Sequence, residues 1–266
     1  MDAVRGMFDA QEFYGVIHAA AKVGGIQANM DDPVGFLVQN NLINNNVILS
    51  ARDAGIQRML FMASACMYPR DYKNPLKEEY LLAAPLEPTN EAYALSKIVA
   101  TKLCEYLCEQ GGLSYKTLVP CNLYGIGDYF GEDRSHLMAA AIKKVWLAMQ
   151  NGNSDVEIWG DGMARREFLF TDDLAKFILQ CLEQIENLPN YLNIGWGSDL
   201  TVNEYYEMVA EALDYVGVFK HDLSKPTGMM HKLLDSSKAK TYGWAPEISM
   251  QEGIRRTVES FKALQE

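Results

Sequence analysis

The chain has 266 residues, of which 48% are hydrophobic and 22% are charged, a composition typical of a folded protein with one sizeable core. Its formal net charge is −11 at pH 7 with dispersed lysines and arginines, which excludes a surface built to bind nucleic acid. The five cysteines form no CxxC pair, and no uncharged apolar run could span a bilayer, so we expect no metal site, no membrane span and a cytoplasmic location.

Runs typical of strands alternate with runs typical of helices in the first half of the chain. The strand-like runs cover 14–20, 58–65 and 115–125, and the helix-like runs between them cover 33–55 and 92–110. The strand-like runs are too apolar to leave one face in water, which indicates parallel strands with helices on both faces. The sequence therefore predicts an α/β fold with a doubly wound, Rossmann-type parallel sheet.

The pattern becomes looser after Gly125, and Gly, Asp and Arg gather around 159–167. This composition is typical of loops that hold a ligand. We therefore expect a smaller substrate lobe that is interleaved with the sheet. The predicted division is a partial dinucleotide-binding domain of 1–124 and 171–197, and a substrate-binding lobe of 125–170 and 198–266.

Small and polar residues end three of the predicted strands. They are Ala19-Ala20 after the first strand, Ser64 at the end of the second and Pro120 to Asn122 in the third. In parallel α/β sheets, ligands bind at the carboxyl ends of the strands. We expect the three strand ends to meet at one site.

Tyr93 and Lys97 are four residues apart in a helix-like run, which places both side chains on one helix face. An ammonium within roughly 4–6 Å stabilises a phenolate and lowers the tyrosine pKa, so the pair could act as an acid/base. The Ser64 hydroxyl could donate to a carbonyl oxygen that Tyr93 protonates. Taken alone, the two side chains could also lie on a solvated helix face.

The order Ser64, Tyr93, Lys97 resembles the extended short-chain dehydrogenase/reductase superfamily, in which a nicotinamide cofactor lies along the strand ends. The finer resemblance, to the GDP-L-fucose synthase family, rests on AAAKVGGI, FMASACMYP, LEPTNEAYALSK, PCNLYGIGD, RSHLM and RREFLF, which follow in order. Members of this family are bifunctional 3,5-epimerase/4-reductases of GDP-4-keto-6-deoxy-D-mannose. The resemblance implies NADP(H) as cofactor, a GDP-sugar as substrate and a homodimer.

Carried over residue by residue, the resemblance makes Ser64, Tyr93 and Lys97 the reductase triad. It makes Cys66 and His136 the acid/base pair for epimerisation. A C4 ketone acidifies the protons on C3 and C5, so inversion needs one group that removes a proton and one that returns it. A thiol pKa of about 8.5 and an imidazole pKa of about 6.5 suit both tasks near neutral pH. Without the resemblance, Cys66 could be a small buried hydrophobe and His136 a histidine at a helix start.

The resemblance also implies which residues bind the ligands. The predicted cofactor-binding residues are Ala20, Ala21, Met62, Ala63, Ser64, Tyr93, Lys97, Pro120, Asn122, Leu123 and His136. The predicted substrate-binding residues are Lys144, Trp159, Arg166 and Lys232. Trp159 could instead pack between lobes, and Arg166 could form a solvated pair with Arg165.

Several positions depart from the family pattern and leave the sugar open. Lys144 stands where better-known members carry Arg, which keeps the charge but loses the bidentate fork. Thr227 replaces an acidic residue, and Met230 with His231 replaces a Pro-Arg pair. GDP-heptose reductases are therefore an alternative. A sugar-nucleotide 4,6-dehydratase is disfavoured because Ala65 and Cys66 follow Ser64, where a carboxylate is needed.

The largest departure is that no GxxGxxG motif occurs in the chain, and its first strand-like run, YGVIHAAAKVGGI, resembles the family's fourth strand. Judged by motif position, we expect roughly the first fifty residues of the family pattern, with the phosphate-binding turn, to be absent. We accordingly expect an N-terminally truncated sheet and little activity from the 266 residues alone. A cofactor-free binding or structural module of the same fold is the alternative.

Overall fold

The computed structural model describes residues 2–131, 135–152 and 155–265. Arg134 of the RSHLM motif lies outside them. Four parallel strands form the main sheet, in the order β1 (Val16–His18), β2 (Arg58–Met62), β3 (Ser114–Pro120) and β8 (Tyr191–Ile194). The register pairs His18 with Phe61, and Met62 with Leu118, so the carboxyl ends of the strands lie at one edge. The predicted α/β fold with a parallel sheet is confirmed.

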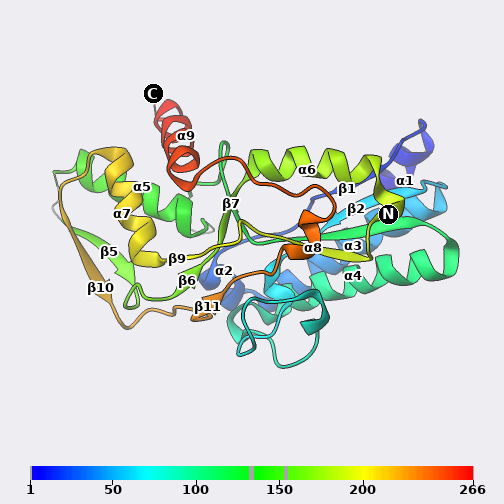
Figure 1. Cartoon of the computed structure of the whole chain (residues 1–266), viewed down its shortest axis with the longest axis horizontal. Coiled ribbons are helices and arrows are strands. Elements are labelled where there is room, and N and C mark those ends of the chain that lie inside the picture. The colour runs from blue at the N-terminus through cyan, green and yellow to red at the C-terminus, as the bar shows by residue number, and fades with distance from the viewer. Residues whose placement is uncertain (1, 132–134, 153–154, 266) are drawn as a thin grey trace.

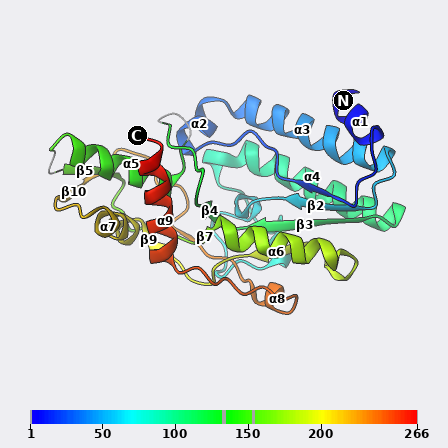
Figure 2. The same cartoon turned by 90° about the horizontal axis from the view of Figure 1, so that it is seen from above.

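Helices cover both faces of this sheet. Helices α3 (Pro33–Asp53) and α4 (Glu91–Gly111) lie side by side on one face, and α6 (Thr171–Glu183) lies on the other (Figure 2). Asp32 caps α3 by accepting a hydrogen bond from the Gly35 N–H at 2.8 Å. Gly112 ends α4 in the left-handed conformation, with φ of 66°. The short α1 (Asp2–Asp9) packs against α3.

A smaller lobe lies beside the sheet along the long axis of the molecule (Figure 1). Its helices are α5 (Leu137–Gln150), α7 (Val202–Leu213) and α9 (Met250–Ala263). Its strands form a parallel pair, β5 (Asp155–Trp159) with β10 (Val218–Asp222), and a three-stranded sheet of β11 (His231–Lys232), β6 (Arg165–Arg166) and β9 (Leu200–Thr201). A further parallel pair, β4 (Asn122–Tyr124) with β7 (Phe168–Phe170), follows the end of β3.

Short elements connect these parts. They are α2 (Ile26–Asp31), α8 (Ser237–Lys240) and the 3₁₀ helices η1 (Ala65–Met67), η2 (Glu78–Tyr80), η3 (Pro88–Asn90) and η4 (Ile185–Asn187). The helix η3 runs directly into α4, and η1 follows β2 after two residues. The helix η1 thus carries the predicted catalytic residue Cys66, and η3 leads into the helix that carries Tyr93 and Lys97.

Each of the two lobes has its own hydrophobic core. The sheet core contains Phe61, Leu118 and Phe177, and the second core contains Tyr205 and Phe261. Leu234, Ala239 and Trp244 pack into the sheet core although they come late in the chain. The predicted lobe boundaries stay a prediction. The segment with Leu234, Ala239 and Trp244 packs on the sheet core, although the sequence predicted it to belong to the substrate-binding lobe.

Strand β1 forms an edge of the main sheet. Among the described residues no strand pairs with its outer side, and the side chain of Ile17 is 42% exposed. Ala19 and Ala20, which follow β1, are also exposed. The backbone groups along this side are therefore available for pairing with another strand.

Neither a membrane helix nor a metal cluster is found in the part of the chain that the structure describes. Within it, no helix combines the length and apolar character needed to cross a bilayer. No group of three or more His, Cys, Asp or Glu side chains there could hold a metal ion. All five cysteines are free thiols, and Cys108 alone among them is not buried.

A buried polar network fastens the segment after β2 to the end of the sheet. Asn193 of β8 accepts a hydrogen bond from the Tyr68 hydroxyl at 2.5 Å and donates to the Leu76 carbonyl at 2.9 Å. The Asn193 N–H donates to the Glu78 carboxylate at 3.0 Å. Because Asn193 and Tyr68 are fully buried, water cannot replace a lost partner.

We expect Tyr68→Phe to lower the free energy of unfolding by about 1–3 kcal/mol, because it leaves the Asn193 side-chain oxygen buried without its donor. The measurement is urea denaturation followed by circular dichroism. Tyr106→Phe is the matched control, since the Tyr106 side chain is 53% exposed. Equal stabilities of the two variants would show that the network contributes nothing to stability.

Candidate active site

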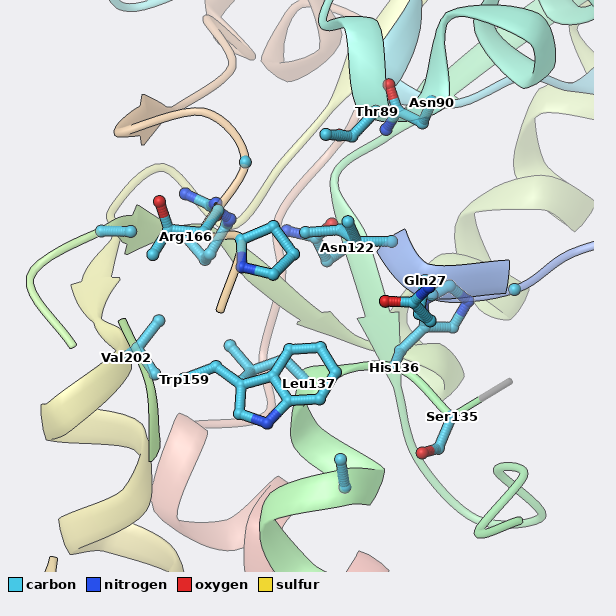
Figure 3. Close-up of a pocket in the computed structure, with 18 of the residues that line it drawn as sticks. Gln27, Thr89, Asn90, Asn122, Ser135, His136, Leu137, Trp159, Arg166 and Val202 are labelled. Carbon is cyan, nitrogen blue, oxygen red and sulfur yellow. The ribbon is translucent and has the colours of Figure 1, made fainter. Parts of the chain in front are cut away.

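A cavity of about 580 Å³ opens at the carboxyl ends of β2 and β3, within the size range of small-molecule sites. Its lining comes from both lobes. Thr89 and Asn90 lie on one side, Arg166 and Trp159 on another, and His136 near Gln27 of α2 (Figure 3). The cavity therefore collects side chains from segments that are far apart in the sequence.

Most residues predicted to act in catalysis or to bind the substrate line this one cavity. Four of the five predicted catalytic residues do so, namely Ser64, Cys66, Tyr93 and His136. All four predicted substrate-binding residues also do so, namely Lys144, Trp159, Arg166 and Lys232. Lys97 is not in the lining but lies behind Tyr93, with its Nζ 5.6 Å from the centre of that ring.

The predicted cofactor-binding residues divide into two groups. Ser64, Tyr93, Asn122 and His136 line the cavity. The others lie outside its lining, behind it or along the segments that follow β1, β2 and β3, namely Ala20, Ala21, Met62, Ala63, Lys97, Pro120 and Leu123. The residues of the second group thus lie along the edge of the sheet and not in the lining of the cavity.

Ser64 and Cys66 are held together by the start of η1. The Ser64 side chain caps this helix by accepting the Cys66 N–H at 3.4 Å. Cys66 is buried, and burial raises the pKa of its thiol above the usual range, against the opposing effects of Ser64, Lys232 and Lys97. The thiol therefore carries its proton at neutral pH and can act as a proton donor.

Lys97 is buried against the rings of Phe61 and Tyr93. Its ammonium donates to the Met62 carbonyl at 2.7 Å and lies 4.8 Å from the centre of the Phe61 ring. Burial lowers the pKa of Lys97 to about 8. The group therefore loses its charge only a little above neutral pH.

The predicted lowering of the Tyr93 pKa is wrong. Burial raises the pKa of the phenol, and the nearby Cys66 acts in the same direction. The Lys97 ammonium is directed to the Met62 carbonyl and does not outweigh this burial. Tyr93 is therefore a phenol at neutral pH, which suits a proton donor rather than a base.

His136 stands at the N-cap of α5 without a capping hydrogen bond and presents its ring to the cavity (Figure 3). Its surface is exposed there, yet protein atoms enclose the ring on its other sides. This enclosure lowers the pKa of His136, Asp128 raises it and Lys232 lowers it again. The imidazole is therefore neutral at pH 7 and can accept a proton, the complement of the Cys66 thiol.

Positive side chains gather on the wall of the cavity that the smaller lobe forms. The Arg166 guanidinium donates to the backbone carbonyls of Arg165 at 2.8 Å and Thr227 at 2.7 Å. Lys144 donates to the Glu157 carbonyl at 3.0 Å. Because backbone oxygens rather than carboxylates accept these hydrogen bonds, the positive charges remain available to an anionic ligand.

Sequence reasoning missed Glu167, which ties the site together from beneath. Its carboxylate accepts the Gly197 N–H at 2.7 Å and the Leu234 N–H at 3.0 Å, and its carbonyl accepts the Asn122 amide at 2.8 Å. Burial raises the pKa of Glu167 to about 7. Its position beside Arg166 in RREFLF was the available signal.

A further side of the lining also escaped prediction. It is formed by α2 and η3, whose cavity residues include Gln27, Asn29, Glu87, Thr89 and Asn90. These residues lie in the quoted motifs AAAKVGGI and LEPTNEAYALSK or directly beside them. The motifs showed that these two segments matter to the family, but they did not indicate that α2 and η3 line the same cavity.

The donor set fits the nicotinamide end of a dinucleotide. Ser64 and Tyr93, which line the cavity, carry hydroxyl groups, and Lys97 lies behind the Tyr93 ring. The exposed Ala19 and Ala20 keep the end of β1 open to a ligand that continues along the strand ends. The sequence contains no GxxGxxG turn that would hold a pyrophosphate.

Residues 1–195 match the model of the NAD dependent epimerase/dehydratase family. The chain is 46% identical to GDP-L-colitose synthase of Yersinia pseudotuberculosis, over 92% of this chain and 80% of that protein. It is also 46% identical to GDP-L-fucose synthase of Azorhizobium caulinodans, over 92% and 79%. Its structure is similar to a GDP-mannoheptose C4 reductase from Campylobacter jejuni with NADP bound, with a TM-score of 0.88 and 31% identity over 98% and 85% of the two chains.

The chain thus belongs to the NAD dependent epimerase/dehydratase family and, within it, to the GDP-L-fucose synthase family. The resemblance predicted from the motifs is confirmed. The roles of individual residues stay predictions that the geometry of the cavity supports.

The buried ammonium of Lys97 should make stability depend on pH in a defined window. Its pKa is about 8 in the folded chain, against 10.5 for a free lysine. Between these values the unfolded chain holds the proton more tightly, so stability rises with pH. We expect the stability of the parent relative to Lys97→Met to rise by up to about 3 kcal/mol from pH 8 to pH 10.5.

The measurement is urea denaturation of both proteins at several pH values. The difference between parent and variant removes the contributions of tyrosines and cysteines that titrate in the same range. A difference that stays constant with pH would show that burial does not destabilise the Lys97 charge.

Proposed function

We propose that the protein is an NADP(H)-dependent 3,5-epimerase/4-reductase that converts a GDP-4-keto-6-deoxyhexose into GDP-L-fucose or a close relative. One observation carries the proposal: a single cavity holds a protonated thiol, a neutral imidazole and a phenol beside a wall of positive charge. The first three suit proton transfer at a keto sugar, and the wall suits its diphosphate. Bound NADPH would supply hydride to C4 of the sugar.

Epimerisation would use the opposite proton states of Cys66 and His136. The C4 ketone of the substrate acidifies the protons on C3 and C5. The neutral imidazole of His136 accepts a proton from one face of the sugar, and the Cys66 thiol returns one from the other. The first inversion leaves an imidazolium and a thiolate. Proton exchange with solvent restores both groups before the second inversion, or the second inversion restores them by the reverse transfers, in which the thiolate accepts a proton and the imidazolium donates one.

Reduction would use Ser64 and Tyr93. The Ser64 hydroxyl donates to the C4 oxygen as negative charge develops there. The Tyr93 phenol then gives its proton to this oxygen, and its raised pKa means that it still carries this proton at neutral pH. The Lys97 ammonium behind the ring stabilises the phenolate that is left.

The diphosphate of the substrate would lie against Lys144, Arg166 and Lys232. Burial lowers the pKa of Lys232, but an anion beside it would favour its charged form. The Trp159 side chain offers a flat apolar surface on the same wall. The sugar at the far end would then reach Cys66 and Tyr93.

The identity of the sugar is a separate proposal. A GDP-L-fucose synthase and a GDP-L-colitose synthase are each 46% identical to this chain, and the similar structure from Campylobacter jejuni is a GDP-mannoheptose C4 reductase. We place the 6-deoxyhexose first because several of the curated relatives are GDP-L-fucose synthases. Parallel assays with 6-deoxy, 3,6-dideoxy and heptose 4-keto substrates would decide it.

We also propose a cytoplasmic homodimer that forms through α3 and α4. On α3, Val34, Val38 and Leu42 are exposed at intervals of four residues, so they form one apolar stripe. On the adjacent α4, Val99 and Tyr106 are exposed as well. Pairing of two such faces would bury both stripes, and the free cysteines are compatible with a reducing compartment.

Cys66→Ser should abolish proton exchange at C3 and C5 while sparing reduction of an already epimerised ketone. The serine hydroxyl is a much weaker acid than the cysteine thiol, so it gives up its proton far less readily at neutral pH. Deuterium incorporation from D₂O measures exchange, and oxidation of NADPH measures reduction. Cys108→Ser, outside the cavity, is the control. Undiminished incorporation in the Cys66 variant would assign this residue to core packing.

Tyr93→Phe should lower the rate of reduction by roughly 10²–10⁴-fold, the usual contribution of a positioned acid/base group. Deuterium exchange at C3 and C5 should change much less, because the phenol acts only at C4. Single-turnover oxidation of NADPH gives the rate, and Tyr106→Phe serves as the exposed control. A variant that reduces the ketone at the parent rate would rule out Tyr93 as the proton donor.

A further inference from the structure

Strand β10 and the turn after it bring the exposed Lys225 beside Trp159, which lines the cavity, although Lys225 itself lies outside that lining. Strand β10 pairs with β5 so that Asp222 lies opposite Trp159, and the Gly160 N–H donates to the Asp222 carbonyl at 2.8 Å. The Asp222 carboxylate accepts the Ser224 N–H at 3.0 Å, and the Lys225 N–H donates to the Asp222 carbonyl at 3.3 Å. This tight turn places the Lys225 Nζ 5.5 Å from the centre of the Trp159 ring.

The segment that carries Lys225 is held in place on its other side as well. Pro226, Thr227 and Gly228 line the cavity, and the Thr227 carbonyl accepts the Arg166 guanidinium at 2.7 Å. At Gly160, with φ of 72°, an added Cβ would lie 2.1 Å from the Thr227 methyl group. The segment therefore packs directly on the turn after β5, which limits the reach of Lys225 to the mouth of the cavity.

A second ammonium lies over the same ring. The Lys144 Nζ is 5.5 Å from the centre of Trp159, and the indole N–H donates to the Glu157 carboxylate at 3.1 Å, which fixes the ring. Burial lowers the pKa of Lys144, Glu157 raises it and the ammonium of Lys225 lowers it again. The two like charges oppose each other in the free protein, and an anion between them would relieve this repulsion.

We propose that Lys225 is a further substrate-binding residue, which contacts the diphosphate of the nucleotide sugar together with Lys144 and Arg166. The proposal rests on the proposed function, because it assigns one more contact at the same site. Lys144 offers a point charge without the two-pronged contact of an arginine, so a single phosphate group needs a second cation nearby. Lys225 supplies this cation from the turn after β10, beside the same ring as Lys144.

Calorimetric titration with GDP tests the assignment. We expect Lys225→Ala to weaken GDP binding by about 3–10-fold, the effect of an exposed charge contact, and Lys225→Arg to bind close to the parent level. Binding of guanosine, which lacks the diphosphate, should not change. The dependence of GDP affinity on salt should be weaker in Lys225→Ala than in the parent.

Lys220→Ala is the matched control, since Lys220 lies on β10, just before the turn of Lys225, but is paired with Asp155. A Lys225→Ala protein that binds GDP like the parent, while Lys144→Ala and Arg166→Ala bind it less well, would overturn the role of Lys225 alone. A parent protein that does not bind GDP would overturn the proposed function together with this assignment.

Discussion

The arrangement of the site depends on the hydrogen bonds of one buried carboxylate. Glu167 holds the backbone at Gly197 and Leu234 with its two oxygens, and its carbonyl holds Asn122. Gly195 must lack a side chain because a Cβ there would lie 2.4 Å from the Glu167 oxygen. Lys232 is two residues from Leu234 and Arg166 is adjacent to Glu167, so two cations of the cavity take their positions from this residue.

Burial then sets the proton state of each reacting group. The same loss of water raises the pKa of Cys66 and Tyr93 and lowers that of His136 and Lys97. Neutral forms are favoured throughout, which leaves two donors, one acceptor and a weakened ammonium in one enclosed space. A cavity that opened widely to water would return each group toward its ordinary titration and would remove this division of roles.

Much of this could be predicted from the sequence because local patterns carry it. Apolar runs predicted the strands, and the spacing of Tyr93 and Lys97 predicted one helix face. The position of Ser64 after a strand predicted its place at the sheet edge. The two groups of ligand-binding residues were predicted from motif order, and all four of the predicted substrate-binding residues line the cavity.

The remaining features depend on contacts between segments that are distant in the chain. Glu167 and Leu234 are 67 residues apart, and Lys225 reaches Trp159 only through the pairing of β10 with β5. No local pattern encodes such contacts. The raised pKa of Tyr93 was missed for the same reason, because the number of protein atoms around the phenol is a property of the whole core and not of the Tyr-Lys spacing.

The composition of the cavity wall also has a consequence during synthesis. Its lining begins at Gly24 and ends at Lys232, so the residues through Lys232 must leave the ribosome before the site can close. Parallel strand pairing across such separations is slow because loop closure precedes the contacts that stabilise it. Until β11 pairs with β6, Lys232 is not beside Arg166 and the cavity wall is incomplete, so ligand binding can favour only the last steps of folding.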